Sequence, residues 1–192
     1  MCQTRSGVAV YMGEDSVRLC LCDTDSHSEI RSHHNIRDDG GAGDRQTPLE
    51  YVPGADFCDL ETWELIFDAG RPEWWTEAMT SSVIRDFRAD LRPKIEKLLA
   101  TGVWDGDLSL NCKLLPSGLS ALTSIGGDAD FRLLTDAAGL SALTSIGGGA
   151  FFQSLTDASG LSSLTSIGGY ADFPLLTDAD RASLLSRVKG TN

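Results

Sequence analysis

The hexapeptide Leu-Thr-Ser-Ile-Gly-Gly at residues 122–127 decides the fold of the C-terminal half of this chain. It recurs at residues 143–148 and 164–169, so the copies begin 21 residues apart. A fixed period of this length is typical of a solenoid, in which each repeat buries its apolar side chains against its neighbours. We therefore expect the hexapeptide to supply scaffold rather than chemistry.

The repetition begins upstream of the first hexapeptide. Gly106 and Asp107 match Gly127 and Asp128 at the same 21-residue offset. About four rungs follow from this alignment: residues 106–126, 127–147, 148–168, and a last one from 169 that leaves the pattern after 178. Residues 180–188 then have the spacing of a short amphipathic cap.

Each rung is expected to hold two short strands. One follows the glycine pair and has apolar residues at its first and third positions, such as Leu108 and Leu110. These point inward because side chains alternate along a strand. The other is Leu-Thr-Ser-Ile, with its leucine and isoleucine inward, and the glycines turn the chain between the two. Successive rungs should pair as parallel strands about 4.8 Å apart.

This repeat resembles known leucine-rich repeats. One resemblance is to the repeats of receptor L domains, and it rests on the order of the hexapeptide and on Asp-Leu-Ser-Leu-Asn at residues 107–111. The other is to bacterial surface leucine-rich repeats, which residues 143–151 resemble. The resemblance covers residues 104–180 and implies a binding scaffold. We therefore expect a leucine-rich-repeat-like parallel β-solenoid with a C-terminal cap at residues 104–192. An α+β domain at residues 1–103 would cap its open end.

The N-terminal half has a mixed pattern. Alternating apolar residues predict a β-hairpin at 7–22 and further strands within 49–68, separated by a long polar loop at 23–48 with one helical turn. A helix should then begin at Thr80 and end at Gly102. Pro93 lies inside it, so we expect a kink or a break near residues 91–92.

Composition limits the classes of function. The formal net charge is −12, which argues against direct binding of nucleic acid because phosphate contacts need a positive field. No basic patch is visible in the sequence. Five cysteines without framework spacing favour free thiols in a reducing compartment. With no signal peptide and no long apolar run, we expect a cytoplasmic protein without membrane contact and without a cofactor.

Two segments of the N-terminal half resemble uncharacterised proteins of phages and prophages. They are residues 25–30, Asp-Ser-His-Ser-Glu-Ile, and residues 71–76, Arg-Pro-Glu-Trp-Trp-Thr. This resemblance implies an accessory protein that acts on host machinery, which would place it in the cytoplasm of the host cell.

Two sets of candidate contact residues follow from these patterns. Outward positions of the rung strands give an acidic and aromatic surface, with partial burial of Phe151 under a loop as the alternative; its residues are Asp128, Asp130, Phe151, Tyr170 and Asp172. Residues 56–77 hold seven acids against one arginine, with tryptophans between them. From this segment we select Glu61, Glu64, Trp74 and Trp75. Aromatic anchors with polar rims are typical of protein interfaces.

The preferred interpretation is a non-catalytic protein-interaction module. Its acidic surface would occupy the basic, nucleic-acid-binding surface of a host protein, such as a defence complex, as an inhibitor of the anti-CRISPR kind does. One alternative is an enzyme that uses His27 with Glu29 or Asp25 as acid and base. The other is a metal-stabilised structural module, whose potential ligands are Cys20, Cys22, His27, His33 and His34.

Overall fold

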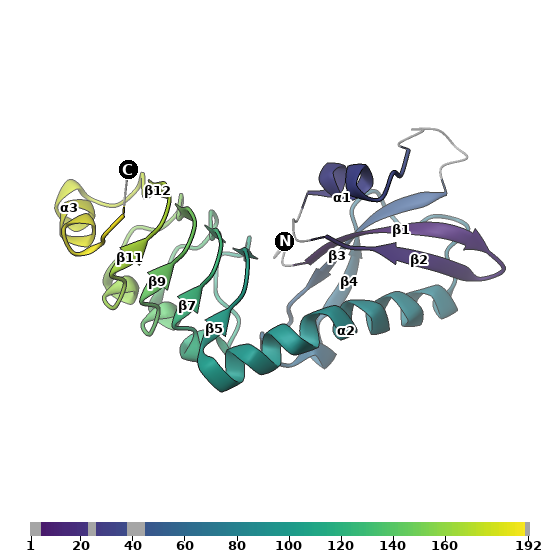
Figure 1. The fold of residues 1–192 in the computed structure, drawn as a ribbon, viewed down its shortest axis with the longest axis horizontal. Helices are drawn as coiled ribbons and strands as arrows, with labels where there is room; N and C mark the ends of the chain where they lie inside the picture. Colours follow the sequence, from purple (N-terminus) through teal and green to yellow (C-terminus); the bar gives the residue numbers. More distant parts are fainter. Residues whose placement is uncertain (1–4, 23–25, 38–44, 191–192) are drawn as a thin grey trace.

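The N-terminal half is built on one antiparallel sheet. A computed structural model describes residues 5–22, 26–37 and 45–190 (Figure 1). The sheet order is β2-β1-β3-β4, with β1 (Arg5–Gly13), β2 (Ser16–Cys20), β3 (Gln46–Val52) and β4 (Glu64–Phe67). The predicted hairpin and the later strands are confirmed. Glu14 and Asp15 form the hairpin turn with positive φ angles of 44° and 58°.

The long helix α2 (Glu77–Thr101) covers one face of this sheet (Figure 1). Its buried side chains are spaced by three and four residues along one side; they are Met79, Val83, Phe87, Leu91, Ile95 and Leu98. Gly102 ends the helix with φ of 72°, and its N–H donates to the carbonyl of Leu98, as predicted.

The expected start of α2 and the expected break within it were wrong. The helix begins one turn before Thr80, with Thr76 at the N-cap position. The hydroxyl of Thr80 instead accepts a hydrogen bond from the indole of Trp75 at 2.8 Å. The helix also continues through Pro93 without a break. Pro93 is exposed, while the apolar residues on either side of it are buried, so packing outweighs the missing hydrogen bond.

The opposite face of the sheet is covered by α1 (His27–His33) (Figure 1). The helical turn predicted in the polar loop is confirmed, and Ser26 caps it by accepting from the N–H of Glu29. Ile30 packs there against Val8 and Cys20, and these three side chains form a small second core. The rest of the predicted loop lies partly outside the described residues.

The C-terminal half contains two parallel sheets of four strands. One follows the order β11-β9-β7-β5, with the strands β5 (Val103–Trp104), β7 (Ser124–Ile125), β9 (Ser145–Ile146) and β11 (Ser166–Ile167). The other follows β12-β10-β8-β6, with the strands β6 (Leu108–Ser109), β8 (Ala129–Asp130), β10 (Ala150–Phe151) and β12 (Ala171–Asp172). Both parts of the predicted parallel β-stack are therefore present, and Figure 1 shows them side by side.

Short 3-10 turns close the repeats, at η2 (Leu119–Ala121), η3 (Ala138–Leu140) and η4 (Ser159–Leu161). The interior holds the predicted leucines and isoleucines together with a row of phenylalanines, Phe131, Phe152 and Phe173. The ring centroids of Phe131 and Phe152 lie 5.1 Å apart, and those of Phe152 and Phe173 lie 5.3 Å apart. Stacking of identical side chains from successive repeats gives the core its regularity.

A C-terminal helix, α3 (Asp178–Arg187), covers the last repeat, as expected from the sequence. Leu184 of α3 is fully buried, and the backbone of Lys189 bonds to Thr165 and Ile167. At the other end, the loop before the short η1 (Leu60–Thr62) meets the first repeat, because the backbones of Ala55 and Phe57 bond to Ser117. Caps therefore cover both ends of the stack.

Candidate functional site

The outward face of the β6-β8-β10-β12 sheet carries the first predicted set, which we call the repeat strip: Asp128, Asp130, Phe151, Tyr170 and Asp172. Strand register places Asp130, Phe151 and Asp172 beside one another on neighbouring strands. Tyr170 precedes the last strand and is 61% exposed. The sequence alternation therefore placed these side chains on the correct face.

Phe151 is half-buried, and an arginine from the preceding repeat covers it. The guanidinium of Arg132 lies 5.5 Å from the centroid of the Phe151 ring, and its Nε lies 3.3 Å from the carboxylate of Asp130. A cation over an aromatic face is attractive, and the ion pair holds the cation there. A side chain therefore contributes to the partial burial of Phe151 that was expected from a loop.

The carboxyl group of Asp130 lies in an unfavourable environment. Burial raises its pKa above the ordinary range, although Arg132 opposes the shift. An ionised carboxylate at this position costs folding free energy at neutral pH. The pair with Arg132 therefore offsets only part of the cost of burying this carboxylate.

Asp128 has a structural role besides its exposed position. The N–H of Asp128 donates to Asp107 Oδ1 at 2.8 Å, and Asp128 Oδ1 accepts from the N–H of Gly149 at 2.6 Å. This ladder links three successive repeats at the corner after the glycine pair. The ladder ends at Gly149, which has no carboxylate to accept from the N–H of Tyr170.

The second predicted set does not form one patch. Trp75 is only 5% exposed, so its assignment to the surface was wrong: its ring fills the core against Phe67. Trp74 is half-buried and packs against Tyr11 at 5.2 Å between centroids. Glu64 is exposed on β4. Glu61 lines a cavity.

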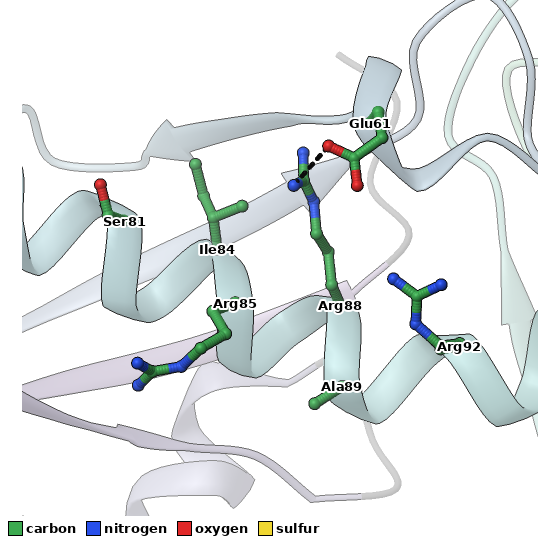
Figure 2. Close-up of a pocket in the computed structure, with 7 residues that line it drawn as sticks. All are labelled: Glu61, Ser81, Ile84, Arg85, Arg88, Ala89 and Arg92. Atoms are coloured by element: carbon green, nitrogen blue, oxygen red, sulfur yellow. Dashed lines mark ion pairs between the residues drawn. The ribbon is translucent and has the colours of Figure 1, made fainter.

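That cavity is an arginine-lined pocket on α2, with a volume of about 560 Å³ (Figure 2). Its lining residues come from one side of the helix and from η1; they are Glu61, Ser81, Ile84, Arg85, Arg88, Ala89 and Arg92. The expectation that the chain has no basic patch was therefore wrong. The spacing of the arginines, by three and then four residues, places them on one helix face and could have revealed the pocket.

Arg88 is the anchored member of this group. It donates to the hydroxyl of Tyr51 at 2.9 Å and to the carbonyl of Leu60 at 3.2 Å, and it pairs with Glu61 at 2.6 Å (Figure 2). Burial is also the main reason for the raised pKa of the Tyr51 phenol. Glu61 is therefore neutralised within the pocket and contributes little to an acidic surface.

His27 faces a different pair of acids from the one expected. Its ring lies between Glu50 of β3 and Asp68, which follows β4, with shortest nitrogen–oxygen distances of 3.4 and 3.3 Å. Glu29, one of the two acids considered in the alternative enzyme interpretation, is exposed. Asp25 lies outside the described residues.

The predicted zinc ligands do not come together either. Among the residues that the structure describes, His27, Glu50 and Asp68 are the only group of three or more metal-ligating side chains close enough to share an ion. Cys20 is buried beneath α1, and burial raises the pKa of its thiol. The His34 ring meets the carbonyl of Leu21 at 2.8 Å. No disulfide joins the four described cysteines.

Comparisons with known proteins add no functional information. No protein-family model matches the chain, and neither a curated protein nor a solved structure does. Among the described residues, no helix has the length and apolar character needed to cross a membrane. Function must therefore be argued from the described surfaces alone.

Proposed function

We propose that this chain is a non-catalytic protein-interaction module and that the repeat strip is its binding surface. The parallel stack would act as a short leucine-rich-repeat-like solenoid. Its repeating side chains form the interior, while the side chains on the strip change from one repeat to the next. In a scaffold of this kind, the repeating interior side chains provide stability and the variable surface side chains provide recognition.

Asp130 is the observation that carries the proposal. Burial raises the pKa of its carboxyl, so the fold would be more stable with a neutral residue there. Charges that a fold does not need are found preferentially at functional sites. The exposed ring of Tyr170 nearby gives the aromatic anchor that interfaces favour.

Affinity capture from lysates of candidate host cells tests the strip directly. The double variant Tyr170→Ala/Asp172→Asn removes an exposed ring and one acid of the strip. Leu114→Ala is the matched control, because Leu114 is a 72% exposed apolar side chain of the first repeat outside the strip. Proteins enriched by the wild type should be lost with the double variant and retained with the control. Equal enrichment by both variants would show that the strip is not the binding surface.

We further propose that the partner is a host protein with a basic, nucleic-acid-binding surface. The strip contains three carboxylates, from Asp128, Asp130 and Asp172, and the whole chain carries a net charge of −12. Such a surface can compete with phosphates for a positive groove. This activity would make the chain an inhibitor in the host cytoplasm, as a phage accessory protein would be.

Competition measurements separate this finer proposal from simple binding. The purified partner would be titrated with labelled nucleic acid at two salt concentrations, with and without this protein. We expect the apparent Kd for nucleic acid to rise in its presence, and to rise more at low salt. Binding without any change in that Kd would retain the interaction module and overturn the inhibitor.

A further inference from the structure

Three separate elements bring His27, Glu50 and Asp68 together on the sheet face beneath α1. Glu50 pairs in register with Ile66 across β3 and β4, so Asp68, two residues further on, lies on the same face. His27 occupies the first turn of α1, which covers that face. One ligand atom from each residue lies within 4.8 Å of the others.

The imidazole of His27 is oriented as a metal ligand would be. Its Nε2 lies 3.2 Å from the backbone carbonyl oxygen of Leu49, to which an Nε2–H can donate, and 3.4 Å from Glu50 Oε1. In that tautomer the lone pair of Nδ1 is directed toward Asp68, whose Oδ2 lies 3.3 Å away. Metal-binding histidines usually donate their other N–H to a carbonyl or carboxylate in this way.

Glu50 is the most deeply buried of the three residues, with 1% of its surface exposed. The hydroxyl of Ser6 lies 2.9 and 3.0 Å from its two oxygens and is itself fully buried. Burial of a carboxylate is costly unless donors or a cation compensate it. Ser6 therefore has the position of an outer residue that orients a ligand.

The spacing of the donors suits a small divalent cation. Ligand distances of about 2.1 Å in a tetrahedral zinc site leave about 3.4 Å between neighbouring donor atoms. The Nδ1–Oδ2 distance of 3.3 Å in this cluster is close to that value. A site of one imidazole and two carboxylates suits transition metals better than Mg²⁺ or Ca²⁺, which prefer oxygen alone.

We propose that His27, Glu50 and Asp68 bind one divalent transition-metal ion, Zn²⁺ by preference, which ties α1 to the sheet. The side chain of Asp68 is 34% exposed, so the ion can enter and exchange from that side. The site is spatially separate from the repeat strip, because its residues belong to the N-terminal half of the chain. The competing arrangement is a protonated imidazole held between the two carboxylates.

The test uses the full chain, stripped with a chelator and then titrated with Zn²⁺ by calorimetry. We expect one ion per chain and a higher Tm in its presence, because a ligand that binds only the folded state stabilises it. His27→Ala and Asp68→Asn should each weaken Zn²⁺ binding by tenfold or more, and Ser6→Ala by about 10–100-fold through loss of ligand orientation. His33→Ala and Glu64→Gln are the matched controls, from the same helix and the same sheet, and should bind as the wild type does.

Several outcomes would overturn the site. If the wild type takes up no Zn²⁺, the proposed metal site is overturned. If, in that case, His27→Ala is also less stable than the wild type, the cluster is an ion pair alone. Equal affinity in wild type and Asp68→Asn would also overturn the site; this variant changes a partly exposed side chain and is expected to fold. Substitution with Co²⁺ distinguishes the ligands, since a thiolate charge-transfer band would place the ion on cysteines instead.

Discussion

At the scale of single residues, the glycines after each isoleucine have a measurable role. Gly126, Gly147 and Gly168 stack in successive repeats, and a Cβ on Gly147 would collide with the carbonyl oxygen of Gly126. The backbones of neighbouring repeats can approach this closely only without side chains. The sequence predicted a corner here, and the structure adds close contact between repeats as the second reason for glycine.

We expect Gly147→Ala to destabilise the chain by about 1–3 kcal/mol, because the neighbouring repeat must move to relieve the overlap. Gly139→Ala is the matched control, since its Cβ would meet only the flexible end of Leu115 at 3.2 Å. Urea unfolding of both variants measures the difference. Equal stability of the two variants would contradict the proposed packing.

Asp130 provides a prediction that depends on pH. Its pKa is raised in the folded chain, so ionisation costs stability at pH values above that pKa. The cost disappears as the pH falls below the unfolded value of about 3.9, where both states are protonated. Asp130→Asn should therefore be more stable than the wild type at pH 7, and the gain should vanish near pH 3. Urea unfolding at both pH values checks this, and a variant less stable at pH 7 would show that the pair with Arg132 dominates.

At the scale of elements, local sequence patterns predicted the hairpin and the repeat strands, because interactions between nearby residues determine these elements. Alternation predicted the hairpin at 7–22, which the structure places at 5–20, and the 21-residue period predicted both parallel sheets. Each of these predictions needs only neighbouring residues or copies of one motif. The start of α2 was missed because Thr76 and Thr80 are equally good caps in sequence. The structure places Thr80 in the first turn, where its hydroxyl bonds to Trp75.

The candidate sites divide in the same way. The repeat strip could be predicted, since alternation alone sends Asp130, Phe151 and Asp172 outward. The cluster of His27 with Glu50 and Asp68 could not, because 23 and 41 residues of chain separate His27 from its two partners. Only the pairing of β3 with β4 and the placement of α1 bring them together.

Pro93 provides the prediction at this scale. It lacks the N–H that would otherwise bond within α2, yet the helix continues through it and its side chain is exposed. Pro93→Ala should therefore stabilise the chain, by up to about 3 kcal/mol less the entropy that proline removes from the unfolded state. Thermal unfolding measures the change, with the neighbouring exposed residue in Arg92→Ala as control. A lower Tm for Pro93→Ala would show that the proline is part of a required bend.

At the scale of the whole molecule, the two halves share one apolar core. A single cluster of buried side chains runs from Ala9 in the N-terminal sheet to Val188 beyond the last repeat. Phe57 lies at the junction, with its ring 5.3 Å from Trp63 and 5.4 Å from Trp104, the residue that ends β5. The predicted boundary between residues 103 and 104 falls inside that strand. The halves therefore should not unfold independently.

Hydrogen exchange can measure this coupling. Phe57 is fully buried, so Phe57→Ala should cost about 3–5 kcal/mol. In a cooperative molecule that loss accelerates exchange by a common factor of about a hundred or more, as much in β9 as in β3. Leu164→Ala, in the third hexapeptide, is the reciprocal variant and should accelerate exchange in β3 as well. Acceleration confined to the mutated half in either variant would define two separate domains. A common factor would mean that a ligand bound at the metal cluster also stabilises the repeat strip, since both belong to one folding unit.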